Sequence, residues 1–230
     1  MKRIVSGVAV VLMLVCMSGA ARAEEHKAEG TEIVAGVKTW MNTWKREEPG
    51  KEGKTSNSIV LAGPAIEAEF HNHVFAEASY MMSMSDYKVE DAGTTAEISR
   101  NDLDLAVGYQ INHNVGAFLG YRNSAFKEKE TGAKETLSGP LLGVRGSVPV
   151  NEALSVFGKA TYLVTKLKVE DAVSSTTENA PGWIAEVGVK YEFIKHLSGA
   201  LGYKYETTKT KDTSITDTFT GFTLDVMYTF

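Results

Sequence analysis

The sequence predicts an all-β protein, a single antiparallel up-and-down barrel of about ten strands, with eight strands as the alternative. The main support is a repeat of 41 residues that brings apolar residues to equivalent places in five successive units. Two series follow this period: Ile33, Val74, Val115, Val156 and Leu197, and Ile66, Val107, Val148 and Val189. Each unit therefore contributes two strands, and a closed sheet of ten leaves no strand edge unpaired.

The second observation is that side chains alternate between two kinds along each expected strand. Near residues 32–43, Ile33 and Val37 lie on one face, whereas Lys38 and Trp40 lie on the other. A period of two residues is typical of a β-strand with one apolar face. Later strands with the same alternation are expected within 60–70, 74–111, 115–150, 154–193 and 197–230.

Long and short connections alternate between these strands. The long polar connections are expected at 45–57, 86–97, 125–136, 166–181 and 207–218. The short turns are centred on 71–73, 112–114, 151–152 and 195–196. Barrels of the bacterial outer membrane have short turns at the periplasmic end and long loops at the other end. The pattern therefore favours a membrane barrel over a soluble one.

The amino-terminal residues have the pattern of a secretory signal peptide. Lys2 and Arg3 precede an apolar run at 4–15, and the small residues Ala21 and Ala23 mark the expected cleavage site. We therefore divide the chain into a signal peptide at 1–23 and a barrel domain at 24–230. Cleavage removes the single cysteine, so the mature protein can form no disulfide and must be stabilised in another way.

Composition excludes two classes of protein. The chain has 24 basic and 29 acidic residues, and cleavage removes Lys2, Arg3 and Arg22, which leaves 21 basic residues and a net charge of −8. This charge argues against nucleic acid as a partner. After residue 23 no run of 18 apolar residues occurs, which argues against a helical membrane protein. Barrel strands need only about 10 residues, half of them apolar.

Charged residues fall on only one face of the expected strands. Sixteen residues share this face and are predicted to line the lumen: Lys38, Glu67, Glu69, Glu77, Arg100, Asp102, Asp104, Arg122, Arg145, Lys159, Glu186, Lys190, Glu192, Lys204, Glu206 and Asp225. A charged side chain that faces lipid costs about 2–4 kcal/mol at the bilayer midplane, so the uncharged face suits lipid. The alternation alone also fits a soluble lipocalin-like barrel whose apolar face encloses a ligand.

Aromatic residues form two groups on the uncharged face. One group shares the 41-residue period and one height: Tyr80, Tyr121, Tyr162 and Tyr203. The other gathers toward the opposite rim: Phe70, Tyr109, Tyr191, Phe193, Tyr228 and Phe230. Both groups resemble the aromatic girdles at the two interfaces of a bilayer. The chain ends on an alternating apolar strand, in which Tyr228 and Phe230 are the expected assembly signal.

With its signal peptide, alternating hairpins and terminal Phe230, the chain resembles the small bacterial outer-membrane β-barrel superfamily, which includes opacity-type surface proteins. The resemblance implies the outer membrane as location, its lipid and lipopolysaccharide as surroundings, and the barrel-assembly machinery as a partner. It also implies that the long loops can meet an extracellular ligand. Many small members have eight strands, and Pro64 and Pro140 are expected to cause bulges or missing ladder bonds.

The superfamily contains adhesins, narrow channels, membrane stabilisers and a few enzymes, so the fold alone selects no function. We predict a non-enzymatic protein with a structural or surface-interaction role. The alternative is a narrow porin-like channel for ions or small solutes, and a lipid-modifying enzyme or protease is the third class. The first two differ in whether the lumen is filled by paired ions or by water. Inward glycines would leave room for water: Gly36, Gly108, Gly116, Gly120, Gly143, Gly188, Gly202 and Gly221.

Three motifs are candidates for chemical sites, but none of them predicts a catalytic, metal or cofactor site. Asp102 and Asp104 share one face, the minimum for acid–base chemistry, but Arg100 beside them favours ion pairing. The histidines of the His71-x-His73 motif and His113 lie in short turns, where turn geometry explains them better than metal binding. The methionines near one strand end are expected to face lipid or fill the core: Met81, Met82 and Met84.

Overall fold

The computed structural model describes residues 31–70, 72–91, 94–171 and 174–230. The expected signal peptide with Ala21 and Ala23 lies outside these ranges. Within them, no helix is long and apolar enough to cross a membrane. The strands are β1 (Thr31–Glu47), β2 (Lys54–Phe70), β3 (Val74–Ser83), β4 (Tyr87–Asp91), β5 (Thr94–Asn112), β6 (Val115–Glu128), β7 (Lys134–Pro149), β8 (Leu154–Leu163), β9 (Lys166–Glu170), β10 (Ser175–Asn179), β11 (Gly182–Ile194), β12 (Leu197–Lys209) and β13 (Thr216–Thr229).

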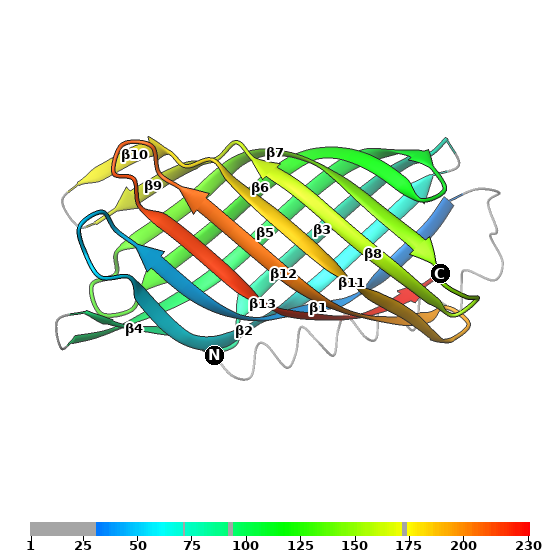
Figure 1. The fold of residues 1–230 in the computed structure, drawn as a ribbon, viewed down its shortest axis with the longest axis horizontal. Coiled ribbons are helices and arrows are strands. Elements are labelled where there is room, and N and C mark those ends of the chain that lie inside the picture. The colour runs from blue at the N-terminus through cyan, green and yellow to red at the C-terminus, as the bar shows by residue number, and fades with distance from the viewer. Residues whose placement is uncertain (1–30, 71, 92–93, 172–173) are drawn as a thin grey trace.

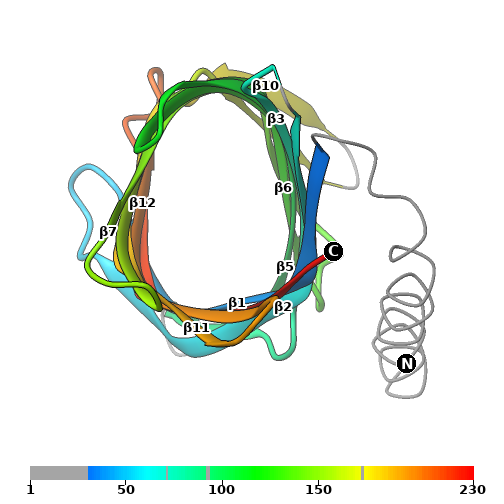
Figure 2. The same cartoon turned by 90° about the vertical axis from the view of Figure 1, so that its right-hand side faces the viewer.

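The strands close into a ten-strand antiparallel barrel, as the sequence predicts. β3 and β4 both pair with β5, so together they occupy one position; β8 continues into β9, and β10 into β11, in the same way. β1 pairs with β13 and closes the ring, which Figure 2 shows along the barrel axis. The 41-residue series falls at or near the start of β1, β3, β6, β8 and β12.

The connections are shorter than the sequence suggests. Most of the expected loop at 45–57 belongs to β1 and β2, and only 48–53 connects them. Likewise β4, β9 and β10 lie inside segments that were expected to be loops. These segments are polar because they extend past the apolar band, where both strand faces can carry polar side chains. We call this side of the barrel the loop end and the side with the short turns the turn end (Figure 1).

Both prolines lie at gaps in the hydrogen-bonded ladders, as expected. The β2–β3 ladder pairs Ala62 with Met82 and resumes at Ala65, so Pro64 has no partner on β3, whereas it pairs with Val37 of β1. Pro140 lies opposite the break between β8 and β9. Neither gap shifts the register. The missing N–H of proline is therefore accommodated without a bulge.

The apolar face of the strands points outward. Val107, Leu119, Val144 and Leu201 are exposed on this outer surface, as are most of the aromatic residues assigned to the two girdles. Trp183 joins the girdle of the loop end, where its ring lies 4.6 Å from that of Tyr162. In a membrane this surface faces lipid.

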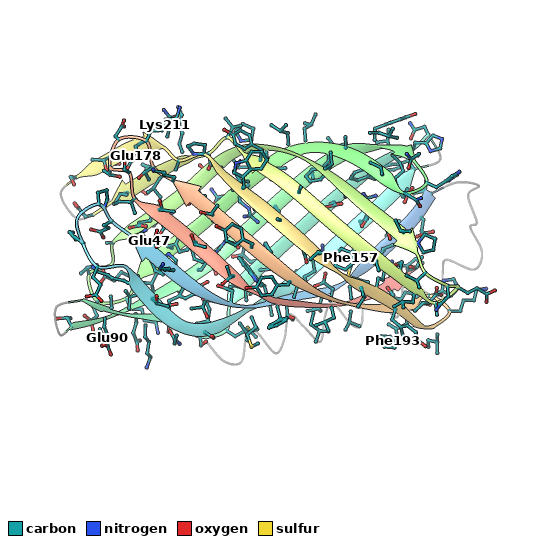
Figure 3. The ribbon with its side chains drawn as sticks, in the orientation of Figure 1. Glu47, Glu90, Phe157, Glu178, Phe193 and Lys211 are labelled. Atoms are coloured by element: carbon teal, nitrogen blue, oxygen red, sulfur yellow. The ribbon has the colours of Figure 1, made fainter. Side chains whose placement is uncertain are left out.

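Five of the eight expected inward glycines have an aromatic ring beside the place of their side chain, so the expectation that glycine leaves room for water is wrong at Gly108, Gly116, Gly143, Gly188 and Gly202. A Cβ atom at Gly108 would lie 2.3 Å from Cζ of Phe75, and one at Gly143 would lie 2.5 Å from Cζ of Phe118. Phe157, labelled in Figure 3, covers Gly188 in the same way, because a Cβ atom there would lie 2.7 Å from its Cε1. Glycine is needed here because the ring of the neighbouring strand occupies the place of its side chain.

Candidate functional site: the barrel lumen

Large aromatic residues lie on the same inward strand faces as the charged residues. Their side chains fill the half of the lumen near the loop end. The aromatic cluster consists of Trp40, Trp44, Ile59, Leu61, Met81, Tyr87, Phe126 and Phe219. Trp44 and Phe219 stack with ring centres 5.7 Å apart, and Phe126 stacks on Phe219 at the same distance. This cluster is not among the predicted lumen residues, which are all charged, although the position of Trp40 on the same strand face as Lys38 indicates that it points inward.

A network of five charged residues lies against this cluster; we call it the central network. Arg100 Nη2 donates to Glu206 Oε1 at 2.8 Å, and Arg122 Nη1 donates to Glu206 Oε2 at 2.7 Å. Arg122 also binds both oxygens of Asp104 at 2.6 Å, while Arg100 Nε donates to Asp102 at 2.8 Å. Charge-assisted pairs of this kind are the strongest hydrogen bonds in proteins. Arg100 and Glu206 are both fully buried.

A second network lies closer to the loop end and was missed by sequence reasoning. Arg46 donates to both oxygens of Glu135 at 3.0 and 2.7 Å and to Asp217 at 2.8 Å. Trp44 Nε1 donates to the same Asp217 oxygen at 2.8 Å. All three charged residues fall in segments that were expected to be loops, so their inward orientation could not be assigned. Extending the alternation of each strand by a few residues would have found them.

A third network lies toward the turn end. Arg145 Nη1 donates to Glu67 and, at 2.8 Å, to Glu77, and Lys159 Nζ donates to Glu77 at 2.6 Å. Glu67 and Glu77 are directly opposite each other on β2 and β3, where two carboxylates repel. Arg145 offsets this repulsion. Its guanidinium also lies 3.5 Å from the ring centre of Phe75.

Several of these ion pairs span the lumen from wall to wall. In the ring of ten strands, β5 and β12 are five positions apart, and so are β1 and β7. Such strands lie opposite each other. Arg100 joins the first pair through Glu206, and Arg46 joins the second through Glu135. With the aromatic cluster between them, these buried contacts occupy the lumen near the loop end, and we call this part of the barrel the seal.

Between the seal and the turn end lies a chamber of about 810 Å³. Trp40, Met81 and Arg122 line its closed end, and His113 and Asn114 lie at its mouth. Apart from Glu32, every charged residue that lines the chamber is one of the sixteen that the sequence predicts to line the lumen. Those that line the chamber are Lys38, Glu67, Glu69, Glu77, Asp104, Arg122, Arg145, Lys159, Glu186, Lys190, Lys204 and Asp225.

The remaining residues of the sixteen lie elsewhere. Arg100, Asp102 and Glu206 are buried in the seal. Glu192 is exposed at the rim of the turn end, where its carboxylate accepts a hydrogen bond from the His196 N–H at 3.3 Å. Its place is therefore the rim rather than the interior of the lumen.

Not every chamber charge has an ionic partner. Lys38, Glu186 and Asp225 form no ion pair within 4.0 Å among the described residues. Glu186 accepts a hydrogen bond from Thr223 Oγ1 at 2.8 Å. Lys204 lies 3.8 Å from Glu206 and 4.0 Å from the ring centre of Trp40.

Asp102, Asp104 and His73 take part in structural contacts, and His71 lies outside the described residues. Asp102 and Asp104 bind arginines in the central network. His73 has a left-handed backbone with φ of 66°, as turn geometry requires, and its ring lies 6.0 Å from that of Tyr109. In the ranges that the structure describes, no three potential metal ligands gather in one place.

Contacts between neighbouring hairpins tie the loop end together. Lys129 binds Asp86 and Glu97, and the hydrogen bond to the Asp86 carboxylate raises the pKa of the Lys129 ammonium. Glu178 accepts hydrogen bonds from the backbone N–H and the hydroxyl of Thr213, the latter at 2.9 Å. Figure 3 shows Glu47, Glu90, Glu178 and Lys211 at this end.

The terminal aromatic residues lie at the seam where the barrel closes. The N–H of Phe230 donates to Ile33 O of β1 at 2.8 Å, and its ring lies 5.0 Å from that of Tyr228. The last residue of the chain thus pairs with the first strand of the barrel.

Comparisons with known proteins agree with this architecture. A family model described as outer membrane protein beta-barrel domain matches residues 58–230. No curated protein matches the chain. The outer membrane protease OmpT from Escherichia coli is similar in structure, with a TM-score of 0.57 at 13% identity over 89% of this chain and 98% of that one.

Two further solved structures resemble the chain more distantly. The translocator domain of the autotransporter NalP from Neisseria meningitidis has a TM-score of 0.49 at 16% identity, covering 97% of both chains. The attachment invasion locus protein Ail of Yersinia pestis has a TM-score of 0.34 at 13% identity, covering 86% of this chain and 98% of that one. Identities this low concern the fold alone.

The family match covers three quarters of the chain and includes nine of the ten barrel positions completely or in large part. The strands close on themselves, the apolar face points outward, and the charges point into the lumen. The chain therefore belongs to the outer membrane protein β-barrel family and is a protein of the bacterial outer membrane.

Proposed function

We propose that this protein is a non-enzymatic, closed outer-membrane barrel with a structural or surface-interaction role. The observation that carries the proposal is the pair of cross-lumen contacts Arg100–Glu206 and Arg46–Glu135, at 2.8 and 2.7 Å. Buried side chains such as Trp40 and Phe219 pack around these ion pairs and, together with them, would block a water path through this part of the lumen. Removing one partner would leave a buried charge unpaired, at a cost of several kcal/mol, so such a closure resists thermal opening.

The loop end supports a surface role. Its hairpins continue as strands and are joined by side-chain contacts such as Lys129–Asp86 and Thr213–Glu178. A surface fixed in this way loses little conformational entropy when it binds a partner. In the usual orientation of outer-membrane barrels this end faces the cell exterior. An extracellular ligand or the carbohydrate of lipopolysaccharide would meet the protein here.

Narrow solute passage is the second candidate, and the chamber favours it. Lys38, Glu186 and Asp225 line the chamber, which would form the part of a conduction path nearest the turn end. Passage would then require the seal to open. In a closed barrel, the seal does not open at equilibrium.

The enzyme class receives less support from the side chains. Similarity to OmpT at 13% identity concerns the fold and carries no catalytic residue to this chain. The carboxylates of Asp102 and Asp104 already accept hydrogen bonds from arginines. Of the histidines in the described ranges, His73, His113 and His196 lie in the turns of the turn end, whereas these acids lie in the central network inside the barrel.

A liposome swelling assay with the refolded mature protein tests the proposal. Liposomes that contain the folded protein should swell in L-arabinose no faster than protein-free liposomes. Folding is checked on each sample by the mobility shift of the unheated protein in gel electrophoresis. Swelling that rises in proportion to the amount of folded protein would contradict a closed barrel and favour narrow passage.

A further inference from the structure

The chamber has an unusual distribution of paired and unpaired charge. On the side of β2, β3, β7 and β8, the charged residues of the third network form ion pairs with one another. On the other side, from β11 round to β1, Lys38, Glu186 and Asp225 form no ion pair within 4.0 Å in the described part of the chain, although Lys38 lies opposite Asp225 and Glu186 lies opposite Lys204 on the neighbouring strand. A charge withdrawn from bulk water needs a partner, so this wall is suited to a ligand that carries charge itself.

These three groups lie close together. Lys38 and Asp225 are directly opposite each other on β1 and β13. Thr223, which donates to Glu186, lies two residues before Asp225 on the same face, a spacing of about 7 Å along a strand. A single ligand can therefore reach an ammonium and two carboxylates at once.

The closed end of the chamber provides an independent observation. Trp40 lines it and is fully buried, yet its indole N–H has no hydrogen-bond acceptor. The ammonium of Lys204 lies 4.0 Å from the centre of the same ring. Trp40 follows Lys38 by two residues on the same face of β1. A donor and two cations at this end favour a ligand with an anionic acceptor.

We propose that the chamber binds a small zwitterion of the amino acid or short peptide class, which enters from the turn end. The ligand carboxylate would meet Lys38 and the Trp40 N–H, and its ammonium would meet Asp225 and Glu186. The volume of about 810 Å³ lies within the range of small-molecule sites. Phe118, which also lines the chamber, offers apolar surface to the rest of the ligand. This inference goes beyond the proposed function and rests on the chamber alone.

Isothermal titration calorimetry on the refolded mature protein tests the charge requirement. L-Phenylalanine and glycyl-L-phenylalanine serve as zwitterions, and 2-phenylethylamine and 3-phenylpropanoate retain the apolar body with one charge each. We expect saturable binding of at least one zwitterion and at least tenfold weaker binding of both single-charge compounds. The absence of binding for both zwitterions, or equal affinity for a single-charge compound, would overturn the proposal.

Substitutions of Lys38 and Asp225 test whether the zwitterion binds in the chamber. Lys38→Met and Asp225→Asn should each weaken zwitterion binding at least tenfold, whereas Lys211→Met, at the loop end, should leave it unchanged. Trp40→Phe keeps the ring and removes the indole N–H, so it tests the carboxylate contact if either charge variant fails to fold. Unchanged affinity in the folded variants would overturn the proposal, as would an equal loss in Lys211→Met.

Discussion

At the scale of single residues, arginine in this lumen has two kinds of partner. Carboxylates from other strands accept hydrogen bonds from the edge of the guanidinium, and an aromatic ring covers its face. Arg100 lies 4.2 Å from the ring centre of Phe219 and also binds Asp102 and Glu206. This combination explains how charged and aromatic residues can share one buried layer, because neither is left facing an empty space.

Arg145→Ala tests how much one arginine of the lumen contributes to the free energy of unfolding. The substitution leaves Glu67 and Glu77 opposite each other without the cation between them. Because these groups are partly exposed to the chamber, we expect a loss of about 2 kcal/mol in the free energy of unfolding, less than for a fully buried pair. Lys190→Ala, which breaks no ion pair of the described residues, should cost less than about 0.5 kcal/mol.

Urea titrations in lipid vesicles compare the two variants. Equal unfolding midpoints for Arg145→Ala and Lys190→Ala would show that water screens the third network and that its ion pairs add no stability.

Gly143→Ala tests the contact between ring and glycine. The new Cβ atom would lie 2.5 Å from both Cζ of Phe118 and the Ala160 carbonyl oxygen, so strand or ring must move. We expect destabilisation of about 1–3 kcal/mol. Gly158→Ala is the matched control, because its nearest neighbour would be the Glu186 carbonyl oxygen at 3.7 Å. The same titration measures both, and equal midpoints would mean that Phe118 does not need a glycine beneath it.

At the scale of elements, alternation in the sequence is enough to predict strand number, order and facing. The positions of Ile33 and Lys38 on opposite faces of β1 follow from a period of two, and the 41-residue repeat gives the number of hairpins. Strand ends could not be predicted, because β10 has no apolar residue and the alternation reverses in β9, where Leu167 is buried and the charged Lys166 and Lys168 are exposed. The network of Arg46, Glu135 and Asp217 was missed for this reason.

Val107→Arg tests which face of β5 meets lipid. Val107 is 46% exposed on the outer surface, two residues from Tyr109 of the girdle near the turn end. Arginine at a lipid-facing position near the midplane should cost about 2–4 kcal/mol. Asn101→Arg is the control on the same strand and face, beyond the apolar band, and should cost at most about 1 kcal/mol.

Refolding titrations into phospholipid vesicles measure this difference. Arginine accommodated at both positions at equal cost would mean that the surface around Val107 is in contact with water.

Phe230→Ala tests the role of the terminal strand in assembly. Phe230 closes the seam by pairing with Ile33 of β1, and it is the expected assembly signal together with Tyr228. We expect a lower yield of folded protein in the outer membrane, judged by heat-modifiable gel mobility. Phe193→Ala removes another exposed aromatic residue at the same rim and should have a smaller effect. A loss of yield as large for Phe193→Ala would assign the effect to the girdle.

At the scale of the whole molecule, the lumen has two unlike halves. The seal near the loop end combines aromatic stacking with ion pairs between opposite strands, and the chamber near the turn end retains unpaired charges. The sequence predicts that charges fill the lumen, but which of them pair depends on which strands face each other. Arg100 and Glu206 are 106 residues apart and become partners only once the ring closes. Closure is therefore a property of the assembled barrel.

Single-channel recording tests this closure most directly. The refolded mature protein is inserted into a planar bilayer at defined voltage, and insertion is verified by the protection of the strands from added protease. Because Arg100–Glu206 and Arg46–Glu135 join opposite walls, the wild-type protein should show no steady conductance above the bare membrane. A reproducible open level in wild-type protein, with discrete steps at each insertion, would contradict a sealed lumen.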